Sequence, residues 1–286
     1  MIYLSSFRFP DWDAEYNFRL NEVKRTCYNT MYPFFVLSRR ALTELNFTEV
    51  TILYGGNGSG KTTALNVIAE KLKLSRASLY NRSSFYADYL NLCSYGKECA
   101  IPADSAVITS DDVFSYMLDI RAVNDGVDAR RDELFEEYSR AKYDRFSVTS
   151  LEDYERLKNA CDARRKTQSA YVKSRLAENV REQSNGESAY FYFTQKIKQG
   201  ALYLLDEPEN SLAPDLQIKL RDFLSDSARF YGCQFIIATH SPFILSMRGA
   251  RIYDLDDDPV SIKKWTELKN VRTWFDFFKD NKNQFE

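Results

Sequence analysis

The sequence lacks several features that would define a class of protein by themselves. Of its 286 residues, 39 are lysine or arginine and 41 are aspartate or glutamate, so the formal net charge is −2. A field this weak excludes a polybasic protein that binds nucleic acid by charge alone. The N-terminus has no basic region followed by an apolar one, and its longest apolar run, residues 33–37, is far too short to span a bilayer. We therefore expect a soluble, cytoplasmic protein without a membrane partner.

Cysteine and histidine are also scarce. The five cysteines form no CxxC pair, and their odd number and wide spacing fit buried thiols better than disulfides or a zinc site. The single histidine is His240. We therefore expect no metal other than the Mg²⁺ of a bound nucleotide.

What the chain does contain is enough apolar sequence to build a large core, with 44% hydrophobic and 15% aromatic residues. Apolar segments typical of strands alternate with patterns of helical spacing, and this alternation predicts an α/β fold. The expected strands include apolar segments at residues 34–37, 42–47, 50–54, 106–109, 201–205, 234–238 and 252–255. The expected helices cover residues 62–74, 189–198 and 215–231.

A highly charged stretch with almost no glycine or proline lies at residues 119–182, and it predicts two helices joined by a turn near residues 147–150. Its first part is acidic and its second part is basic. Two interpretations stay open. The helices could pair through complementary faces, or the second helix could contact a phosphate backbone through Arg164, Arg165, Lys166, Lys173 and Arg175.

The strongest motif is a glycine-rich loop between the expected strand at residues 50–54 and the expected helix at residues 62–74. It fits the phosphate-binding pattern GxxxxGK[ST] and consists of Gly55, Gly56, Asn57, Gly58, Ser59, Gly60, Lys61 and Thr62. Such glycines let backbone N–H groups surround a polyphosphate at the positive end of a helix. We expect Lys61 to reach the β- and γ-phosphates, Thr62 to bind Mg²⁺ and Thr63 to complete the nucleotide contacts. A simple glycine-rich turn would not account for Lys61 and Thr62.

A second motif follows the apolar segment at residues 201–205, where the chain reads Asp206, Glu207 and Pro208. Carboxylates at the end of a buried parallel strand emerge where ligands of open α/β sheets bind. We expect Asp206 to hold Mg²⁺ through a water molecule and Glu207 to orient or deprotonate an attacking water. The alternative is a pair of solvated acids in a turn before Pro208.

Two further elements are weaker alone. His240 follows the apolar segment at residues 234–238, at the strand end where an imidazole could hydrogen-bond a γ-phosphate, although a lone histidine is more often structural. The segment Ser184-Asn-Gly186-Glu187 opens the helix that precedes Asp206. By itself it is a capping box, in which Ser184 and Glu187 satisfy each other's free backbone donors.

The order of these elements along residues 34–255 resembles that of the ABC-type ATPases. The order is the phosphate loop, the helical insertion, the SxGE helix start, the Asp-Glu-Pro strand end and the Thr-His-Ser strand end. The similarity is greatest to the soluble SMC, Rad50, RecF and OLD-like branch, above all to short bacterial ATPases of AAA/ABC type with the sequence LLDEPENSL. The resemblance implies an α/β P-loop NTPase fold, with an ABC-ATPase-type mixed sheet flanked by helices and a short helical-hairpin arm. It also implies ATP and Mg²⁺ as cofactors and an ATP-dependent homodimer.

The resemblance assigns roles to residues of this chain. Glu207, Lys61 and His240 are the implied catalytic residues, with His240 as the switch histidine, and Thr62 and Asp206 are the implied metal ligands. Ser184 and Gly186 of one subunit would contact the γ-phosphate bound by the other, and residues 210–212 would form the D-loop at the dimer seam. The implied activity is hydrolysis of ATP to ADP and phosphate, driving a conformational cycle in DNA-related or antiviral (phage-defence) work.

The chain departs from the family pattern in two places. The Q-loop glutamine has no clear counterpart, and Ser110 or Asp111 stands at the corresponding strand end. The charged stretch has only Cys161 and therefore lacks the CxxC of a zinc hook. Helices of roughly 20–25 residues would make a hairpin of about 30–38 Å, a knob or short lever.

The chain is accordingly divided into an N-terminal part of the ATPase domain (residues 1–110), a helical arm (111–182), a C-terminal part of that domain (183–255) and a C-terminal helical tail (256–286). The tail aromatics, which include Trp274 and Phe278, are expected to pack in the core, with a partner-binding face as the alternative. The main alternative function is an ATP-gated module that holds a toxin or nuclease partner, with hydrolysis as a slow timer. A transporter subunit and a P-loop kinase fit the motifs less well.

Overall fold

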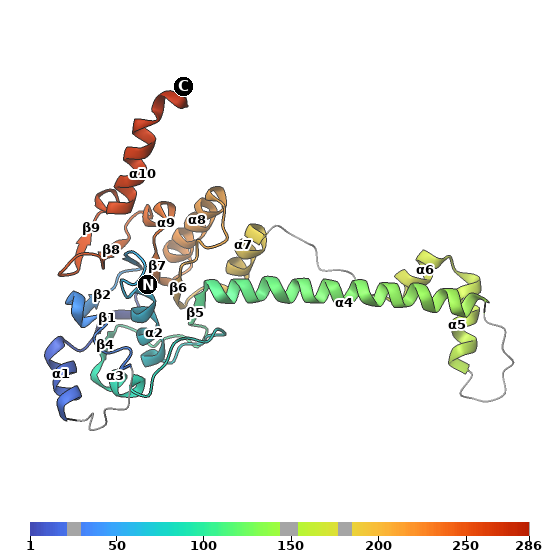
Figure 1. The fold of residues 1–286 in the computed structure, drawn as a ribbon, viewed down its shortest axis with the longest axis horizontal. Coiled ribbons are helices and arrows are strands. Elements are labelled where there is room, and N and C mark those ends of the chain that lie inside the picture. Colours follow the sequence, from blue (N-terminus) through green and yellow to red (C-terminus); the bar gives the residue numbers. More distant parts are fainter. Residues whose placement is uncertain (22–29, 144–153, 177–184, 286) are drawn as a thin grey trace. The chain divides into compact units, whose positions relative to one another are not determined.

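The computed structural model of the chain describes residues 1–21, 30–143, 154–176 and 185–285. This part of the chain divides into two compact units, one of Met1–Phe114 with Asn185–Glu286 and one of Ser115–Ser184 (Figure 1). No helix in the described ranges is both long and apolar enough to cross a membrane.

The main sheet of the first unit has, in the described residues, six strands in the order β5-β6-β7-β3-β8-β9. All neighbouring pairs are parallel except β8 and β9, which are antiparallel, so the sheet is mixed. The strands are β3 (Val50–Tyr54), β5 (Ala106–Thr109), β6 (Leu202–Asp206), β7 (Gln234–Thr239), β8 (Arg251–Asp254) and β9 (Ser261–Lys263). This architecture confirms the predicted fold class, a P-loop α/β fold with a mixed sheet.

The central strands are buried along their whole length, which explains why they read as continuous apolar runs. All five residues of β3 and all six of β7 are buried, as expected for parallel strands covered on both faces. Tyr54 pairs with Thr239, and Asp206 pairs with Ala238. The carboxyl ends of β3, β6 and β7 therefore lie at one edge of the sheet, and this edge positions the loops that follow them.

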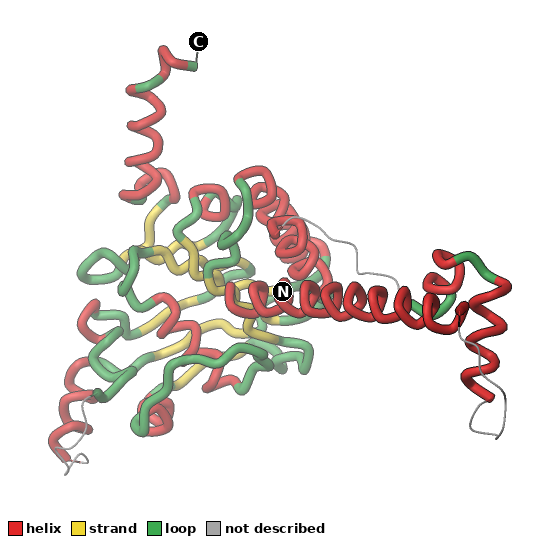
Figure 2. The backbone as a smooth tube through the Cα atoms, turned by 45° about the vertical axis from the view of Figure 1, so that its right-hand side comes forward, coloured by secondary structure: helices red, strands yellow, loops and turns green. Residues whose placement is uncertain are grey.

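Helices cover the sheet, as Figure 2 shows by colour. The helix after the glycine-rich loop, α2, packs against β6 and β7, and α8 packs against α7 and β7. The helices of this unit are α1 (Trp12–Asn21), α2 (Lys61–Leu72), α3 (Tyr86–Leu92), α7 (Asn185–Lys196), α8 (Pro214–Phe230), α9 (Pro242–Leu245) and α10 (Lys269–Asp280).

A second sheet in the described residues has three antiparallel strands in the order β2-β1-β4, namely β1 (Leu4–Arg8), β2 (Glu44–Asn46) and β4 (Ser94–Lys97). The expected strand at residues 34–37 is wrong. That segment is a turn in which Phe35 has a φ of 62°, and Phe34 and Leu37 are buried in the core. Its apolar character reflects burial of the turn and not pairing in a sheet.

The second unit also differs from its expected form. One helix, α4 (Ser110–Tyr143), has 34 residues, which corresponds to about 50 Å. It is longer than the 20–25 residues expected, and the returning half contains two short helices, α5 (Tyr154–Arg165) and α6 (Gln168–Lys173). Five buried side chains join them in a small core, namely Leu134, Tyr138, Ala163, Tyr171 and Val172.

Many charged groups of this unit pair locally. Arg130 forms ion pairs with Glu133 (2.7 Å) and Glu137 (3.0 Å) on its own helix. Of the basic residues proposed to contact phosphate, Lys166 and Arg175 lie 3.6 Å and 3.3 Å from the Asp162 carboxylate. These pairs satisfy the charges of two of the five candidate phosphate ligands.

The aromatic residues of α10 do not pack in the core, so that expectation is wrong. Trp274, Phe275, Phe277 and Phe278 are between 48% and 55% exposed, whereas Val271 is buried. Trp274 and Phe278 stack on each other with ring centroids 6.0 Å apart. The helix is amphipathic, but its aromatic face has no cover in the described part of the chain.

Candidate functional site

The glycine-rich loop connects β3 to α2 and has the backbone that its glycines permit. Gly58 and Gly60 have φ angles of 79° and 96°, in the left-handed region that favours glycine. A Cβ atom on Gly60 would lie 2.9 Å from the Cδ2 atom of Leu37. The loop is therefore closely packed on its outer side and needs glycine at this position for two independent reasons.

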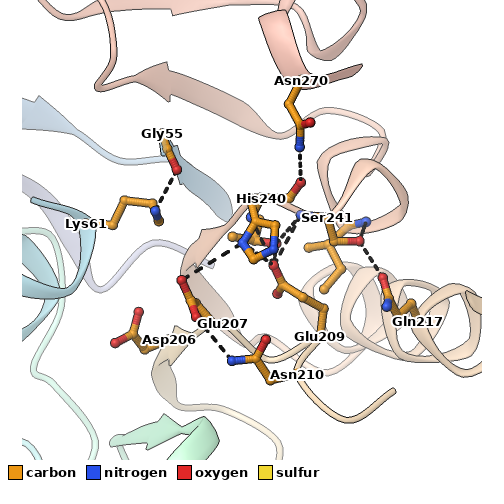
Figure 3. Close-up of polar contacts among 12 residues, drawn as sticks. Gly55, Lys61, Asp206, Glu207, Glu209, Asn210, Gln217, His240, Ser241 and Asn270 are labelled. Carbon is orange, nitrogen blue, oxygen red and sulfur yellow. Dashed lines mark hydrogen bonds and ion pairs between the residues drawn. The ribbon is translucent and has the colours of Figure 1, made fainter. Parts of the chain in front are cut away.

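Lys61 lies inside the loop and is 4% exposed. Its Nζ donates a hydrogen bond of 2.6 Å to the carbonyl oxygen of Gly55 (Figure 3). It donates a second hydrogen bond of 3.0 Å to the carbonyl oxygen of Gly56. A buried ammonium with carbonyl partners is a strong donor held at a fixed place. The lysine is thus preorganised at the loop that its sequence motif predicts.

Thr62 and Asp206 bring the two main motifs together. The Thr62 hydroxyl donates a hydrogen bond of 3.1 Å to Oδ1 of Asp206. Burial raises the pKa of Asp206 to about 6, and the hydrogen bond from Thr62 acts in the opposite direction. A hydroxyl and a partly buried carboxylate side by side are oxygen ligands of the kind that Mg²⁺ prefers, so these residues fit the expected ion.

Glu207 follows Asp206 at the strand end and has a φ of 48°, which is uncommon for a residue other than glycine. Its backbone N–H donates to the carbonyl of Ala238 (2.9 Å), which keeps it beside β7. Its Oε2 accepts a hydrogen bond of 3.1 Å from Asn210, and its Oε1 lies 3.9 Å from Nδ1 of His240. Glu207 also lines the cavity beside the glycine-rich loop.

A cavity of about 360 Å³ lies over the loop. Its lining joins the loop to Glu207 and to the N-terminal segment through Val36, and the other lining residues are Asn57, Gly58, Ser59, Gly60, Lys61, Thr62 and Thr63. Backbone N–H groups at a helix start together with a lysine suit a polyphosphate. The residues present therefore fit a nucleotide with its Mg²⁺.

The structure places the remaining predicted residues as follows. Gly186 lies near the start of α7, where an added Cβ would come 2.8 Å from Leu216 and 3.3 Å from the carbonyl oxygen of Ser211. Ser184 lies outside the described residues. The Thr63 hydroxyl accepts a hydrogen bond of 3.2 Å from Tyr32. Gly186 is therefore close to the loop after β6, and Thr63 contacts the N-terminal segment.

Ser110 and Asp111, the Q-loop candidates, open α4 directly after β5. The acid that caps this helix start is the next residue, Asp112. Its Oδ2 accepts hydrogen bonds from the Thr109 backbone N–H (2.8 Å) and hydroxyl (3.0 Å). The strand end expected to carry a coupling glutamine thus has a structural carboxylate beside it.

Sequence reasoning missed two acids of the site. The Asp256 carboxylate accepts hydrogen bonds from the Gly56 backbone N–H through both Oδ1 (3.0 Å) and Oδ2 (2.9 Å). Glu209 lies two residues after Glu207 and accepts hydrogen bonds at the end of β7. Both stand in acidic or turn sequence that carries no spacing signal, and the LLDEPENSL similarity was the one available pointer to Glu209.

Comparison with known families shows that residues 171–246 match the model described as "AAA domain, putative AbiEii toxin, Type IV TA system". The match covers the acidic strand end and the His240 strand end. It confirms the resemblance to ABC-type P-loop ATPases of the SMC-like branch. Comparison with curated proteins finds no significant match.

Solved structures of low similarity include a dimeric ATP-binding cassette in a post-hydrolysis state, bound to ADP and phosphate. It is 16% identical, with a TM-score of 0.38, and the alignment covers 79% of this chain and 90% of that one. An Smc head bound to the C-terminal winged-helix domain of ScpA is 16% identical, with a TM-score of 0.39 and coverage of 80% and 94%. An Smc head with an extended coiled coil, bound to a ScpA domain and derived from Pyrococcus furiosus, is 13% identical, with a TM-score of 0.38 and coverage of 84% and 95%.

Proposed function

We propose that the chain is an ATP hydrolase that binds Mg²⁺·ATP at the loop of residues 55–62, closes into a homodimer around the nucleotide and opens after hydrolysis. The observation that carries this proposal is the hydrogen bond between Thr62 and Asp206, because it joins the phosphate loop to the acidic strand end. Glu207 lines the same cavity as Lys61. A phosphate-binding cation, two oxygen ligands for the metal and a second carboxylate thus meet at one place.

Each of these side chains has a distinct role in the proposed reaction. Lys61 binds the β- and γ-phosphates and offsets the negative charge that develops there. Glu207 orients the attacking water and accepts its proton. Asn210 holds Glu207 by a hydrogen bond of 3.1 Å, which limits the carboxylate to a small range of directions. Mg²⁺, held by Thr62 and Asp206, would neutralise charge on the phosphate oxygens.

Dimerisation is proposed because none of the described residues that line the cavity over the loop belongs to α7, the helix whose start should complete the site. In the proposed dimer, Ser184 and Gly186 of one copy contact the γ-phosphate bound by the other. Only a closed dimer makes these contacts, so nucleotide binding would shift the population toward it. DNA and an effector protein are proposed as candidate loads on this cycle, in DNA-related or antiviral work.

A matched pair of lysine substitutions tests nucleotide binding and turnover. Lys61→Met removes the cation at the loop and is expected to abolish ATP binding and hydrolysis. Lys71→Met is the control, since Lys71 is on the same helix but donates to the carbonyl of Leu90 (2.7 Å). Equal ATP turnover in both variants, or no turnover by the unmodified protein, would contradict the proposed activity.

The exposed aromatic face of α10 favours a second candidate function, an ATP-gated module that holds a protein partner such as a toxin or nuclease. Asn270, at the start of this helix, donates through its side chain to the His240 carbonyl (3.2 Å) and through its backbone to the Tyr54 hydroxyl (3.1 Å). The helix is therefore hydrogen-bonded to two strand ends of the nucleotide site. A conformational change at these strand ends would alter the position of a partner bound to the helix.

This second function is tested by isolating the protein from its native cells with and without ATP. A stable partner that is released by ATP, and that is lost from a Trp274→Ser, Phe278→Ser variant, would support it. Retention of the partner by that variant would place the contact elsewhere.

A further inference from the structure

Glu209 is a buried carboxylate next to the proposed ATPase site. It is 5% exposed, and one oxygen, Oε1, accepts hydrogen bonds from three donors at the end of β7. These donors are the Thr239 hydroxyl (2.6 Å), the His240 backbone N–H (2.9 Å) and the Ser241 backbone N–H (3.2 Å). All three donors lie where β7 leaves the sheet. Glu209 therefore supplies there the hydrogen-bond acceptor that a neighbouring strand would otherwise provide.

Such a carboxylate is costly to bury and needs its hydrogen bonds. The other oxygen, Oε2, is buried without a partner among the described residues. The turn after β6 fixes the backbone of Glu209, because the Leu212 N–H donates to the Glu209 carbonyl (3.0 Å) and Ser211 adopts a φ of 69°. Glu209 thus has one oxygen without a partner among the described residues, while its other oxygen holds three groups at the end of β7.

The ring of His240 faces the same carboxylate. Its Nδ1 is 3.4 Å from Oε1 of Glu209 and 3.9 Å from Oε1 of Glu207 (Figure 3). The partner of one ring nitrogen decides which nitrogen carries the proton of a neutral imidazole. A carboxylate beside Nδ1 favours a proton on Nδ1, and Nε2 has no hydrogen-bond or ion-pair partner in the described part of the chain.

We propose that Glu209 is a positioning residue that acts through His240. It fixes the His240 backbone and turns Nδ1 inward, so that Nε2 is the nitrogen presented to the γ-phosphate. To donate a hydrogen bond to the γ-phosphate as well, the ring must carry a proton on both nitrogens. The link to the γ-phosphate rests on the proposed ATPase function; the orientation of the ring does not.

Other contacts also hold the backbone at His240 in place. Asn270 donates to the His240 carbonyl (3.2 Å), and the Ser241 hydroxyl donates to Oε1 of Gln217 on α8 (2.6 Å). The backbone around the histidine is therefore held from α10, from α8 and by Glu209. Of these partners, only Glu209 also lies beside the ring.

The first test reads the ring directly and needs no nucleotide. His240 is the only histidine in the chain, so ¹⁵N-histidine labelling gives the NMR signals of one imidazole. With the ring neutral, we expect the proton on Nδ1, and a proton on Nε2 in the unmodified protein would overturn the proposal. Glu209→Ala should move the proton to Nε2, whereas Glu207→Ala, which removes the more distant carboxylate, should leave it on Nδ1.

The second test asks whether Glu209 acts through His240 during turnover. Glu209→Gln keeps an oxygen acceptor but removes the charge, so we expect the Kd for ATP to stay within about twofold and kcat to fall roughly tenfold. In a His240→Ala background the same change should lower kcat no further, because residues that act as a unit are not additive. Equal losses of kcat in both backgrounds would overturn the proposal. Absence of ATP turnover in the unmodified protein would instead defeat the proposed function, and the NMR result would still decide the role of Glu209.

Discussion

The hydroxyl of Thr62, at the start of α2, donates a hydrogen bond of 3.1 Å to the carboxylate of Asp206, at the end of β6. The two residues are 144 positions apart in the sequence, and they meet because β3 and β6 both flank β7. The parallel sheet therefore assembles a phosphate loop and an acidic strand end into one site.

Replacement of Asp206 by asparagine is expected to weaken nucleotide binding only when Mg²⁺ is present. The variant keeps the shape of the side chain but loses the charge that a divalent cation requires, so the Kd for ATP should rise roughly tenfold in Mg²⁺ and change little in EDTA. Titration with a fluorescent ATP analogue measures both values. The exposed Asp226→Asn variant on α8 should change neither, and an equal loss with and without Mg²⁺ would argue against a metal-binding role.

Gly60→Ala is expected to weaken ATP binding strongly while the fold persists. A Cβ atom would suffer both from the φ of 96° and from the 2.9 Å approach to Leu37, so the loop must shift. Gly232→Ala is the matched control, because its φ is 66° but no atom lies within 4 Å of the added Cβ. The control should cost about 1–2 kcal/mol of stability with an unchanged Kd for ATP, whereas equal ATP affinity in both variants would contradict the packing of the loop.

The buried carboxyl of Glu15, on α1, is expected to make stability depend on pH. Burial raises the pKa of Glu15 from 4.5 to about 7, so the folded state holds a proton that the unfolded chain has released. The contribution of Glu15 is complete below about pH 4.5 and is lost as the pH rises toward 7, with a total of roughly 3 kcal/mol at 1.36 kcal/mol per pKa unit.

Denaturant unfolding between pH 5 and pH 8 checks this prediction. The free energy of unfolding of Glu15→Gln should fall less steeply over this range than that of the unmodified protein, since the amide does not ionise. The slope is the informative quantity, because the amide nitrogen changes the absolute stability as well. Parallel curves would show that Glu15 does not carry the pH dependence.

The exposed aromatic face of α10 predicts that polar substitutions there are tolerated. Trp274→Ser and Phe278→Ser remove side chains that are 48% and 50% exposed, so each should change stability by less than about 0.5 kcal/mol. Leu268→Ala, at a fully buried position next to the helix, should cost about 2–5 kcal/mol. Thermal melting distinguishes the two cases, and a large loss from the aromatic variants would restore the interpretation that they belong to the core.

The parts of the fold that were predicted well from the sequence are the buried strands of the parallel sheet. The strands at residues 50–54 and 106–109 were predicted with their observed bounds because these largely buried parallel strands are mostly apolar and are followed by glycine or polar residues. β1 and β4 were missed because they alternate small, polar and aromatic residues without a regular period. The apolar turn at residues 34–37 and the amphipathic α10 were misassigned for a common reason, since hydrophobicity does not tell whether a segment pairs, turns or stays uncovered.

For the site, motifs located the residues whose chemistry needs a fixed spacing along the chain. Lys61 and Thr62 follow their glycines directly, and Asp206 and Glu207 end one strand. Asp256 accepts a hydrogen bond from the backbone N–H of Gly56, which is 200 positions away in the sequence. Only folding brings these two residues together. Glu209 was missed for the same reason, because its role depends on the neighbouring strand end and not on its own sequence context.

The central claim, that ATP unites two copies of this chain, is tested most directly by the oligomeric state of Glu207→Gln. This variant should bind ATP without consuming it, so the closed form should accumulate. Size-exclusion chromatography with light scattering should show a dimer with Mg²⁺·ATP and a monomer with ADP or without nucleotide. A variant that binds Mg²⁺·ATP and remains a monomer at all protein concentrations would contradict the account.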